Sequence, residues 1–335
     1  MEDQAESSSP QRRGPRLWVI LALVPAAAVA VFMGTVLVLH LTAPSIPLST
    51  ASPSPTPSSI IAVVTPRPSI PATESPSVAP STSPSSSASP SPSGPTPAPT
   101  ARWHPAVGDT FQIQYAGPID ITVAASVYDL DSDDTPASTV AALHSVSRHV
   151  FCYIDAGAWE SYRSDAGSFP KSVLGKVIEG WPNERWLDIR KIDTLAPILR
   201  HRLDTCAAKG FDGVDPDNIN GYTNSTGFPL TAADQLRFNR WLAAEAHARG
   251  LAIALKNDGE QARDLVSVFD AAVVEECVAF DECGLYSPFV AAGKPVFDIE
   301  YDRPPNVFCP IAQSLHFEII GKDLELNVYR SGCDD

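Results

Sequence analysis

The sequence has 335 residues, too many for one small module, and sixteen of its 32 prolines lie between Ala43 and Arg102. Residues 103–335 form a stretch of ordinary domain size, whose 35 acidic and 19 basic side chains give a formal charge of −16. A nucleic-acid-binding domain needs a basic surface, so this charge excludes that class and favours a neutral or cationic partner.

An uncharged run of 23 residues, Leu17 to Leu39, lies near the N-terminus. A helix of this length crosses a hydrocarbon core of roughly 30 Å. Three arginines precede the run and the next basic residue is Arg67, so the positive-inside rule predicts a cytoplasmic tail at 1–16 and a transmembrane helix at 17–39. Everything after the helix is then extracellular, held at the cell membrane. A cleaved signal peptide is the alternative, although its apolar core is normally about 7–15 residues.

Residues 43–102 consist mostly of Ser, Thr, Pro and Ala. Such a segment offers little apolar area to offset the entropy of ordering, so we expect a disordered Pro/Ser/Thr-rich linker. Its proline content favours extended polyproline II at about 3.1 Å per residue, which makes it a stalk between membrane and domain.

All six cysteines lie in the exported part, and an even count outside the cytoplasm favours disulfides. Six cysteines allow fifteen pairings, of which we predict Cys277–Cys283, Cys309–Cys333 and Cys152–Cys206. A zinc site is the alternative, but the sequence holds no CxxC and no HxxxH, so we expect no metal and no cofactor.

Eight short apolar runs recur along residues 103–335, separated by helix-like stretches. The clearest helix spans 231–250, with Thr231 as its N-cap and Gly250 as its stop. The runs are 111–117, 125–131, 149–157, 211–218, 252–257, 271–277, 295–302 and 324–330. Eight strands alternating with helices predict an α/β fold, a (β/α)8 TIM barrel. A doubly wound sheet is the alternative, because the first two runs leave no room for a helix between them.

Polar side chains gather at the C-terminal ends of these runs, which form the active-site face in barrel enzymes. They include Asp129, Asp131, Tyr153, Asp155, Asp215, Asp217, Lys256, Asn257, Glu275, Glu276, Glu300 and Tyr301. One such residue can be an ordinary turn residue, but six strands ending this way favour function.

Alternation along a strand places Asp215 and Asp217 on the same side, which we expect to be the barrel interior. Asp217 lies nearer the mouth, and Asp215 is either a substrate-binding or a structural carboxylate. Glu275 and Glu276 have opposite parity, so one of them points inward, and the pattern leaves open which. An inward Glu would complete a glycosidase carboxyl pair with Asp217, and Lys256 would keep one of the two carboxylates ionised.

Ordered blocks across residues 103–302 resemble glycoside hydrolase family 114, the endo-α-1,4-polygalactosaminidases. The blocks are WHPAVGDTFQIQYAG, VYDLD, CYIDAGAWESYR, WLDIR, GFDGVDPDNINGY, LKN, EECVAFDEC and FDIEYD. The resemblance implies a retaining endo-hydrolase with Asp217 as nucleophile and Glu275 as acid/base. It also implies that further residues line the cleft, namely Asp129, Tyr153, Asp155, Lys256 and Glu300. We expect Trp159, Asp215 and Asn218 to bind substrate there as well. After residue 302 the blocks fade, and the eighth strand rests on its pattern alone.

The expected substrate is a cationic amino-sugar polysaccharide, which suits a domain of strongly negative charge. Trp159, Tyr162 and Trp181 follow the third run and either stack on sugar rings or pack their loop onto the barrel. We expect a monomer. Three alternatives remain: a non-catalytic carbohydrate-binding surface protein, a hydrolase of a different glycan, and a structural envelope protein.

Overall fold

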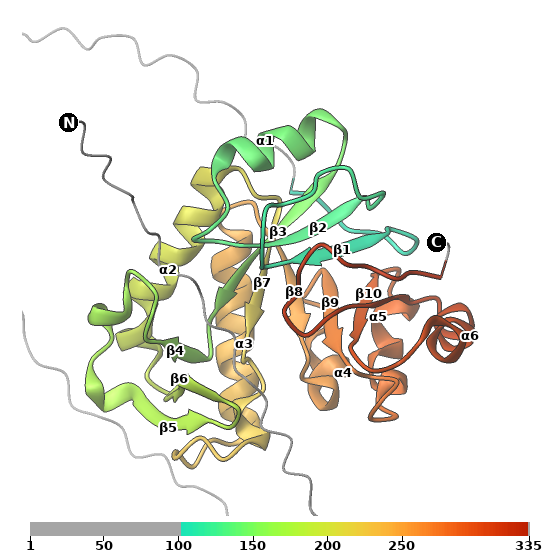
Figure 1. Ribbon diagram of the computed structural model, residues 1–335. Coiled ribbons are helices and arrows are strands. Elements are labelled where there is room, and N and C mark those ends of the chain that lie inside the picture. The colour runs from blue at the N-terminus through green and yellow to red at the C-terminus, as the bar shows by residue number, and fades with distance from the viewer. Residues whose placement is uncertain (1–101, 334–335) are drawn as a thin grey trace, which may run out of the picture. The chain divides into compact units, whose positions relative to one another are not determined.

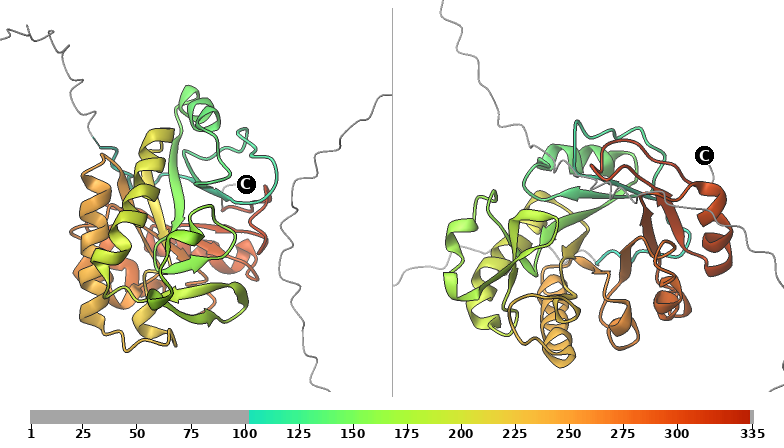
Figure 2. Two further views of the ribbon diagram at one scale, coloured as in Figure 1. Left: turned by 90° about the vertical axis from the view of Figure 1, so that its left-hand side faces the viewer. Right: turned by 60° about the horizontal axis from the view of Figure 1, so that its bottom comes forward.

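The computed structural model describes residues 102–333, and the predicted tail, transmembrane helix and almost the whole linker lie outside them. Within this range no helix combines the length and the apolar character that crossing a bilayer requires. The described part is an eight-stranded parallel sheet curled into a nearly closed barrel with helices outside it (Figures 1 and 2). It is a TIM barrel, and the alternative of an open doubly wound sheet is wrong.

The barrel strands follow one another in chain order, interrupted only by a small separate sheet. They are β1 (Phe111–Gln114), β2 (Val127–Asp131), β3 (His149–Asp155), β7 (Gly213–Asp217), β8 (Ala252–Lys256), β9 (Ala271–Glu275), β10 (Val296–Glu300) and β11 (Glu318–Gly321). The first seven coincide with the first seven predicted runs. As expected, no helix separates β1 from β2.

The eighth predicted strand, 324–330, is wrong. The eighth strand is β11, whose Ile319 and Ile320 are almost fully buried, whereas Leu324 and Val328 are more than two-fifths exposed. A barrel strand is covered on both faces and shows a continuous apolar run, while 324–330 alternates as a half-exposed strand would.

The helices pack around the barrel, and the helix predicted at 231–250 is one of them. They are α1 (Ala137–Ser145), α2 (Ile192–Lys209), α3 (Ala232–His247), α4 (Ala262–Leu265), α5 (Ser287–Ala291) and α6 (Pro305–Leu315). Helix α3 begins as predicted, because Thr231 and Asp234 form a capping box that satisfies two backbone N–H groups. Short 3₁₀ turns complete the loops: η1 (Ala166–Ser168), η2 (Lys171–Val173), η3 (Gly221–Thr223), η4 (Gly259–Gln261) and η5 (Cys283–Tyr286).

A three-stranded antiparallel sheet lies between β3 and α2, where the sequence pattern indicated only a long loop. Its strands are β4 (Ala158–Glu160), β5 (Leu174–Ile178) and β6 (Trp181–Leu187), in the order β4-β6-β5. Figure 1 shows this sheet to one side of β7, beside the barrel.

The seam of the barrel lies between β1 and β11, the two ends of the strand order. The segment after β11 runs beside β1 (Figure 1), where the backbone N–H of Tyr115 donates to the Leu326 carbonyl at 2.8 Å. The Arg330 guanidinium donates to both the Phe111 carbonyl and the Glu318 carboxylate, each at 2.9 Å. Residues 322–331 therefore bridge the seam in place of a strand ladder.

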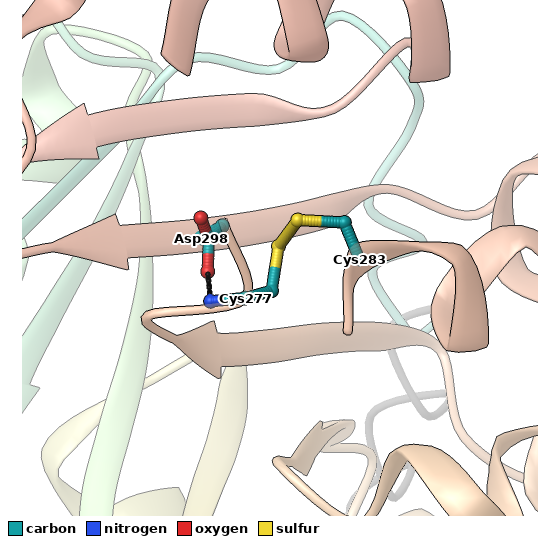
Figure 3. A group of neighbouring side chains, drawn as sticks. All are labelled: Cys277, Cys283 and Asp298. Atoms are coloured by element: carbon teal, nitrogen blue, oxygen red, sulfur yellow. Dashed lines mark hydrogen bonds between the residues drawn. A yellow bond between two sulfur atoms is a disulfide. The ribbon is translucent and has the colours of Figure 1, made fainter. Parts of the chain in front are cut away.

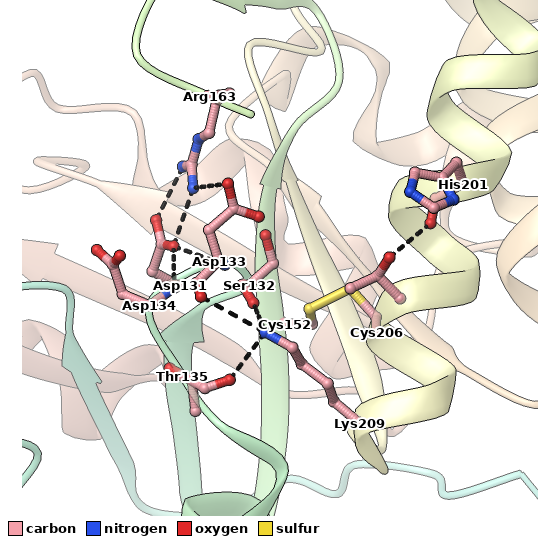
Figure 4. The surroundings of a disulfide bond; sticks show 11 residues. Asp131, Ser132, Asp133, Asp134, Thr135, Cys152, Arg163, His201, Cys206 and Lys209 are labelled. Carbon is pink, nitrogen blue, oxygen red and sulfur yellow. Dashed lines mark hydrogen bonds and ion pairs between the residues drawn. A yellow bond between two sulfur atoms is a disulfide. The ribbon is translucent and has the colours of Figure 1, made fainter. Parts of the chain in front are cut away.

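The three predicted disulfides are the disulfides of the structure. Cys152–Cys206 ties β3 to α2, Cys277–Cys283 closes the loop after β9, and Cys309–Cys333 ties α6 to the segment that bridges the seam. Figure 4 shows the first of these between strand and helix.

Candidate active site

Strand alternation sorts the side chains of the barrel into an interior set and an outer set. One apolar cluster draws residues from seven of the eight strands, so it marks the interior: Phe111, Ile113, Val127, Phe151, Ala252, Ala254, Ala271, Val273, Phe297, Ile299 and Ile320. On β9, Glu275 shares the parity of Ala271 and Val273, so Glu275 points inward. On β7, Asp215 and Asp217 likewise share the parity of Gly213, where an added Cβ would lie 2.6 Å from the interior ring of Phe151.

Asp217 ends β7 at the mouth of the barrel and is held by two donors. The Tyr153 hydroxyl donates to its Oδ2 at 2.9 Å, and the backbone N–H of Asn218 donates to its Oδ1 at 2.8 Å. Its backbone is fixed as well, because a Cβ on Gly157 would lie 1.8 Å from the Asn218 carbonyl oxygen. Only glycine fits that approach.

Tyr153 cannot swing away from Asp217, because its ring is packed on several sides. The ring of Tyr115 lies 4.5 Å away between centroids, the Arg163 guanidinium 5.9 Å and the Lys256 ammonium 5.5 Å from the Tyr153 ring centre. Burial and the charge of Asp217 raise the pKa of Tyr153 well above its ordinary value, so the phenol remains a donor at neutral pH.

Glu275 ends β9 and is held by Tyr301 and Asn257. The Tyr301 hydroxyl donates to Glu275 Oε1 at 2.5 Å, and the Asn257 Oδ1 accepts from the Glu275 backbone N–H at 3.0 Å. Burial, followed by the charge of Glu275, raises the pKa of Tyr301 well above its usual range. The next residue, Glu276, takes a left-handed backbone conformation with φ of 59° and leaves the strand.

Lys256 and Asp215 form a buried ion pair beneath these two carboxylates, with Nζ 3.0 Å from Oδ2. Burial raises the pKa of Asp215 to about 6, although the ammonium opposes this shift. Burial works to lower the pKa of Lys256, but attraction to Asp215, Asp217 and Glu275 outweighs it and raises the pKa. Lys256 therefore stays cationic and acts on both proposed catalytic groups from below.

We call Asp217, Glu275, Asp215 and Lys256, with the tyrosines around them, the centre. Three predicted substrate-binding residues, Asp129, Asp155 and Asn218, lie beside it, where they are buried or bonded to other protein groups. Asp129 and Asp155 are completely buried. Asp155 accepts from the Ala158 backbone at 2.6 Å and from the Asn218 side-chain amide at 2.8 Å. Asp155 and Asn218 thus fix the turn that carries Asp217, and Asp129 lies deeper in the barrel.

Glu300 was expected to line the cleft, and the structure corrects this. It has the parity of Asp298, opposite to the interior residues Phe297 and Ile299, and accepts from the backbone N–H of Val278 at 2.7 Å. Asp298 accepts from the Cys277 backbone N–H at 3.2 Å, beside the Cys277–Cys283 disulfide (Figure 3). Glu300 therefore supports the loop after Glu275 from behind.

Within residues 102–333, the one grouping of Cys and carboxylate groups close enough to hold an ion is Cys277, Cys283 and Asp298. Its two sulfurs are bonded to each other (Figure 3), so they offer no thiolate to a metal.

The small sheet borders the centre with polar and aromatic side chains. The Tyr162 hydroxyl lies 2.7 Å from Glu160 Oε1 and 3.1 Å from Glu184 Oε1. Arg163 joins this sheet to the barrel by a bidentate pair with Asp131 at 2.8–2.9 Å (Figure 4). Burial and the neighbouring Glu160 raise the pKa of Glu184 to about 7.

Of the three aromatic residues considered for sugar stacking, Trp159 packs against the core and donates its indole N–H to the Ala166 carbonyl at 3.0 Å. Tyr162 and Trp181 remain about half exposed, at 51% and 44%. Trp159 therefore packs its loop onto the barrel, whereas Tyr162 and Trp181 have exposed surface that a glycan could contact.

The sequence reasoning assigned no role to two residues of the centre. Tyr115 and Tyr301 each continue an interior parity, from Ile113 and from Ile299. The alternation in FDIEYD could have identified Tyr301 in place of Glu300.

Two hollows of about 390 Å³ each adjoin the centre. The first includes Tyr115, whose ring packs on Tyr153, and the second includes Tyr301, whose hydroxyl donates to Glu275. The first is also lined by Gln114, Ile119, Asp131, Asp134 and Thr135, and the second by Asp302, Arg303, Lys322, Asp323 and Tyr329.

Comparison with known proteins places these features in context. A profile of glycoside hydrolase family GH114 matches residues 92–335. The crystal structure of Ega3 from Aspergillus fumigatus in complex with galactosamine is 38% identical, with a TM-score of 0.67 over 70% of this chain and 98% of that chain. The glycoside hydrolase domain of PelA from Pseudomonas aeruginosa is 16% identical with a TM-score of 0.53, over 67% and 98%, and shares the fold. An uncharacterised protein of Deinococcus radiodurans is 28% identical over 59% of this chain and 70% of its own length.

Proposed function

The chain belongs to glycoside hydrolase family GH114 and is a glycoside hydrolase, and from this premise we propose that it cleaves α-1,4-linked galactosamine polymers internally by a retaining two-carboxylate mechanism. Asp217 is the nucleophile and Glu275 the acid/base. The observation that carries the proposal is that both carboxylates face one barrel mouth, each held by a tyrosine hydroxyl.

The geometry supports different duties for the two groups. Asp217 accepts two hydrogen bonds, from the Tyr153 hydroxyl and the Asn218 backbone N–H, which fix the direction of its carboxylate, and this suits a nucleophile. In the first step Glu275 gives its proton to the glycosidic oxygen while Asp217 attacks the anomeric carbon and forms a covalent glycosyl ester. In the second step Glu275 takes a proton from water, whose oxygen displaces Asp217.

The polymer we propose carries free amino groups, which are cationic at neutral pH. The carboxylates at the mouth and the charge of −16 on residues 103–335 attract such a chain. The 38%-identical Ega3 was solved in complex with galactosamine, which supports the same sugar class.

We further propose that residues 17–39 anchor the enzyme in the cell membrane, with residues 43–102 as a stalk and a monomeric hydrolase domain outside the cell. The three disulfides support an oxidising compartment.

The first test incubates the full-length chain with partly deacetylated α-1,4-galactosamine polymer and follows products by mass spectrometry. We expect wild type to release oligosaccharides, and Asp217→Asn and Glu275→Gln to release none while still binding polymer. Glu276→Gln is the matched control, because this neighbour leaves the strand and should keep activity. NMR of the first products distinguishes retention from inversion.

Normal turnover by Asp217→Asn would refute the assignment of the nucleophile. Binding without cleavage by wild type would favour the non-catalytic carbohydrate-binding protein. Neither binding nor cleavage would mean that the family is right and the glycan is a different one.

A further inference from the structure

Three carboxylate oxygens and one phenol oxygen are buried in the barrel without a conventional donor. Among the described residues, Asp129 Oδ1, Asp129 Oδ2, Asp215 Oδ1 and the Tyr115 hydroxyl are buried polar atoms that make no regular hydrogen bond. Both aspartates are completely buried. Buried polar groups are almost always satisfied, so a cluster of four requires a specific explanation.

These groups neighbour one another. Asp129 pairs in register with Ile113 and Phe151, and Phe151 pairs with Gly213, so Tyr115 and Asp215 each lie one interior position nearer the mouth than Asp129. The Asp129 carboxyl interacts there with both the Asp215 carboxylate and the Tyr115 hydroxyl. Two ionised carboxylates in contact repel strongly in a buried site, whereas one proton between them turns the same contact into an O–H···O hydrogen bond. The arrangement therefore needs a proton in addition to that of Tyr115.

We propose that Asp129 is a neutral carboxylic acid that donates its proton to Asp215, and that it thereby acts as a positioning residue for the Asp215–Lys256 pair beneath Asp217 and Glu275. The effect of this proton on turnover rests on the proposed function. The proton on Asp129 itself can be observed without any turnover.

The distribution of charge explains why the proton resides on Asp129. The titratable groups facing it are Tyr115 from the end of β1, Asp215 from β7 and Lys256 from β8, with Tyr153, Asp217 and Glu275 nearer the mouth. Lys256 bonds Asp215 at 3.0 Å and so keeps that carboxylate charged. Asp129 has no cation at such a distance among the described residues, and burial followed by repulsion from Asp215 raises its pKa well above its ordinary value.

The proton on Asp129 matters for the reaction because Lys256 is the cation that interacts with Asp215, Asp217 and Glu275. If Asp129 were ionised, Lys256 would face a second buried carboxylate and its charge would be drawn away from the mouth. When Asp129 is neutral, Asp215 is oriented by two partners, Asp129 and Lys256. The Lys256 ammonium then keeps one position below Asp217.

The first arm of the test compares Asp129→Asn with Asp129→Ala in the full-length chain, using turnover of the galactosamine polymer. Asparagine is neutral, has nearly the same shape, donates through Nδ2 to Asp215 and accepts from Tyr115. We expect its kcat to stay within about five-fold of wild type, whereas alanine leaves Asp215 with Lys256 alone to orient it and should lower kcat about 50-fold or more with little change in KM. Asp120→Asn, which changes an exposed carboxylate hydrogen-bonded to Thr122, is the matched control.

The second arm reads the proton directly by isotope-edited infrared spectroscopy at neutral pH. Wild type should show carbonyl absorption from protonated aspartic acids, Asp258 among them, and Asp129→Asn should remove one component of it that persists in Asp120→Asn. Absence of that loss, or a kcat in Asp129→Asn as low as in Asp129→Ala, overturns the proposal. If wild type does not cleave the polymer at all, the proposed function fails while the infrared arm still decides the protonation of Asp129.

Discussion

The two proposed catalytic carboxylates are held by tyrosines from separate strands, Tyr153 on β3 and Tyr301 just after β10. A phenol whose pKa is raised stays protonated across the physiological range and gives a hydrogen bond of constant direction. Each tyrosine is packed within the barrel, so the carboxylates are held in place by the core and not by the loops.

Outside the centre, Asp258 is a carboxyl group whose protonation couples stability to pH. It is 5% exposed, and burial followed by repulsion from Glu260 raises its pKa to about 8. Its unfolded pKa is about 3.9, so the folded state binds the proton more tightly and the stabilisation is complete below about pH 4. This contribution is lost progressively as the pH rises toward 8.

We therefore expect Asp258→Asn to flatten the fall in Tm between about pH 5 and 8.5. Asparagine suits the left-handed backbone at this position, where φ is 58°, and can still accept from Asn239. Thermal melts across this range would show the difference. Asp120→Asn serves as the control, because the lowered pKa of Asp120 leaves no titration in this window. Parallel Tm curves for wild type and Asp258→Asn would contradict the expectation.

At the scale of elements, the sequence predicted seven barrel strands because buried parallel strands show short, dense apolar runs. It also predicted helix α3 from its cap. The prediction of the eighth strand failed because 324–330 shows a cleaner alternation of apolar and polar residues than Glu318–Gly321 does. The strands of the small sheet are short and partly exposed, and their pairing depends on contacts that no local pattern records.

The sequence could predict those site residues whose direction, into or out of the barrel, follows from alternation along a strand. Asp217 followed from alternation along its strand, and Tyr153 and Lys256 from their position at strand ends. Alternation applied to Ile299 would have replaced Glu300 by Tyr301. The family resemblance, not the pattern, selected Glu275 over Glu276. The depth of Asp129 and Asp155 could not be predicted, because burial at a barrel mouth depends on which neighbouring loops cover it.

We expect one disulfide, Cys152–Cys206, to contribute more to stability and another, Cys277–Cys283, to contribute more to catalysis. Cys152–Cys206 spans 54 residues of sequence and Cys277–Cys283 spans 6. Loop entropy then predicts that replacing each pair by alanine lowers the free energy of unfolding by about 4 kcal/mol and about 2 kcal/mol respectively. The shorter pair closes the loop directly after Glu275, so its removal should lower kcat more.

Denaturant unfolding and polymer turnover of the two double-alanine variants measure both effects. A larger loss of stability from the Cys277→Ala, Cys283→Ala variant, or an equal loss of kcat in both variants, would contradict this division. A mock substitution at the exposed Ser145, Ser145→Ala, controls for handling.

At the scale of the whole molecule, the charge of residues 103–335 sets the interaction with a polycation. The Debye length falls from about 30 Å at 0.01 M salt to about 10 Å at 0.1 M, so long-range attraction is screened over this range. We expect KM for the partly deacetylated polymer to rise several-fold with added NaCl and kcat to change little. The same titration with a fully N-acetylated polymer is the control, and a KM that ignores salt for both polymers would argue against a cationic substrate.

The bridged seam has a consequence for how the domain is made. A ribosome delivers β1 first, but the residues that cover its edge, 318–331, come more than 200 positions later. A sheet made from the first seven strands alone would have two unpaired edges, and such edges are templates for pairing with other chains. Chaperone dependence during synthesis and export should therefore centre on β1, and the Cys309–Cys333 bond should be the last of the three to form.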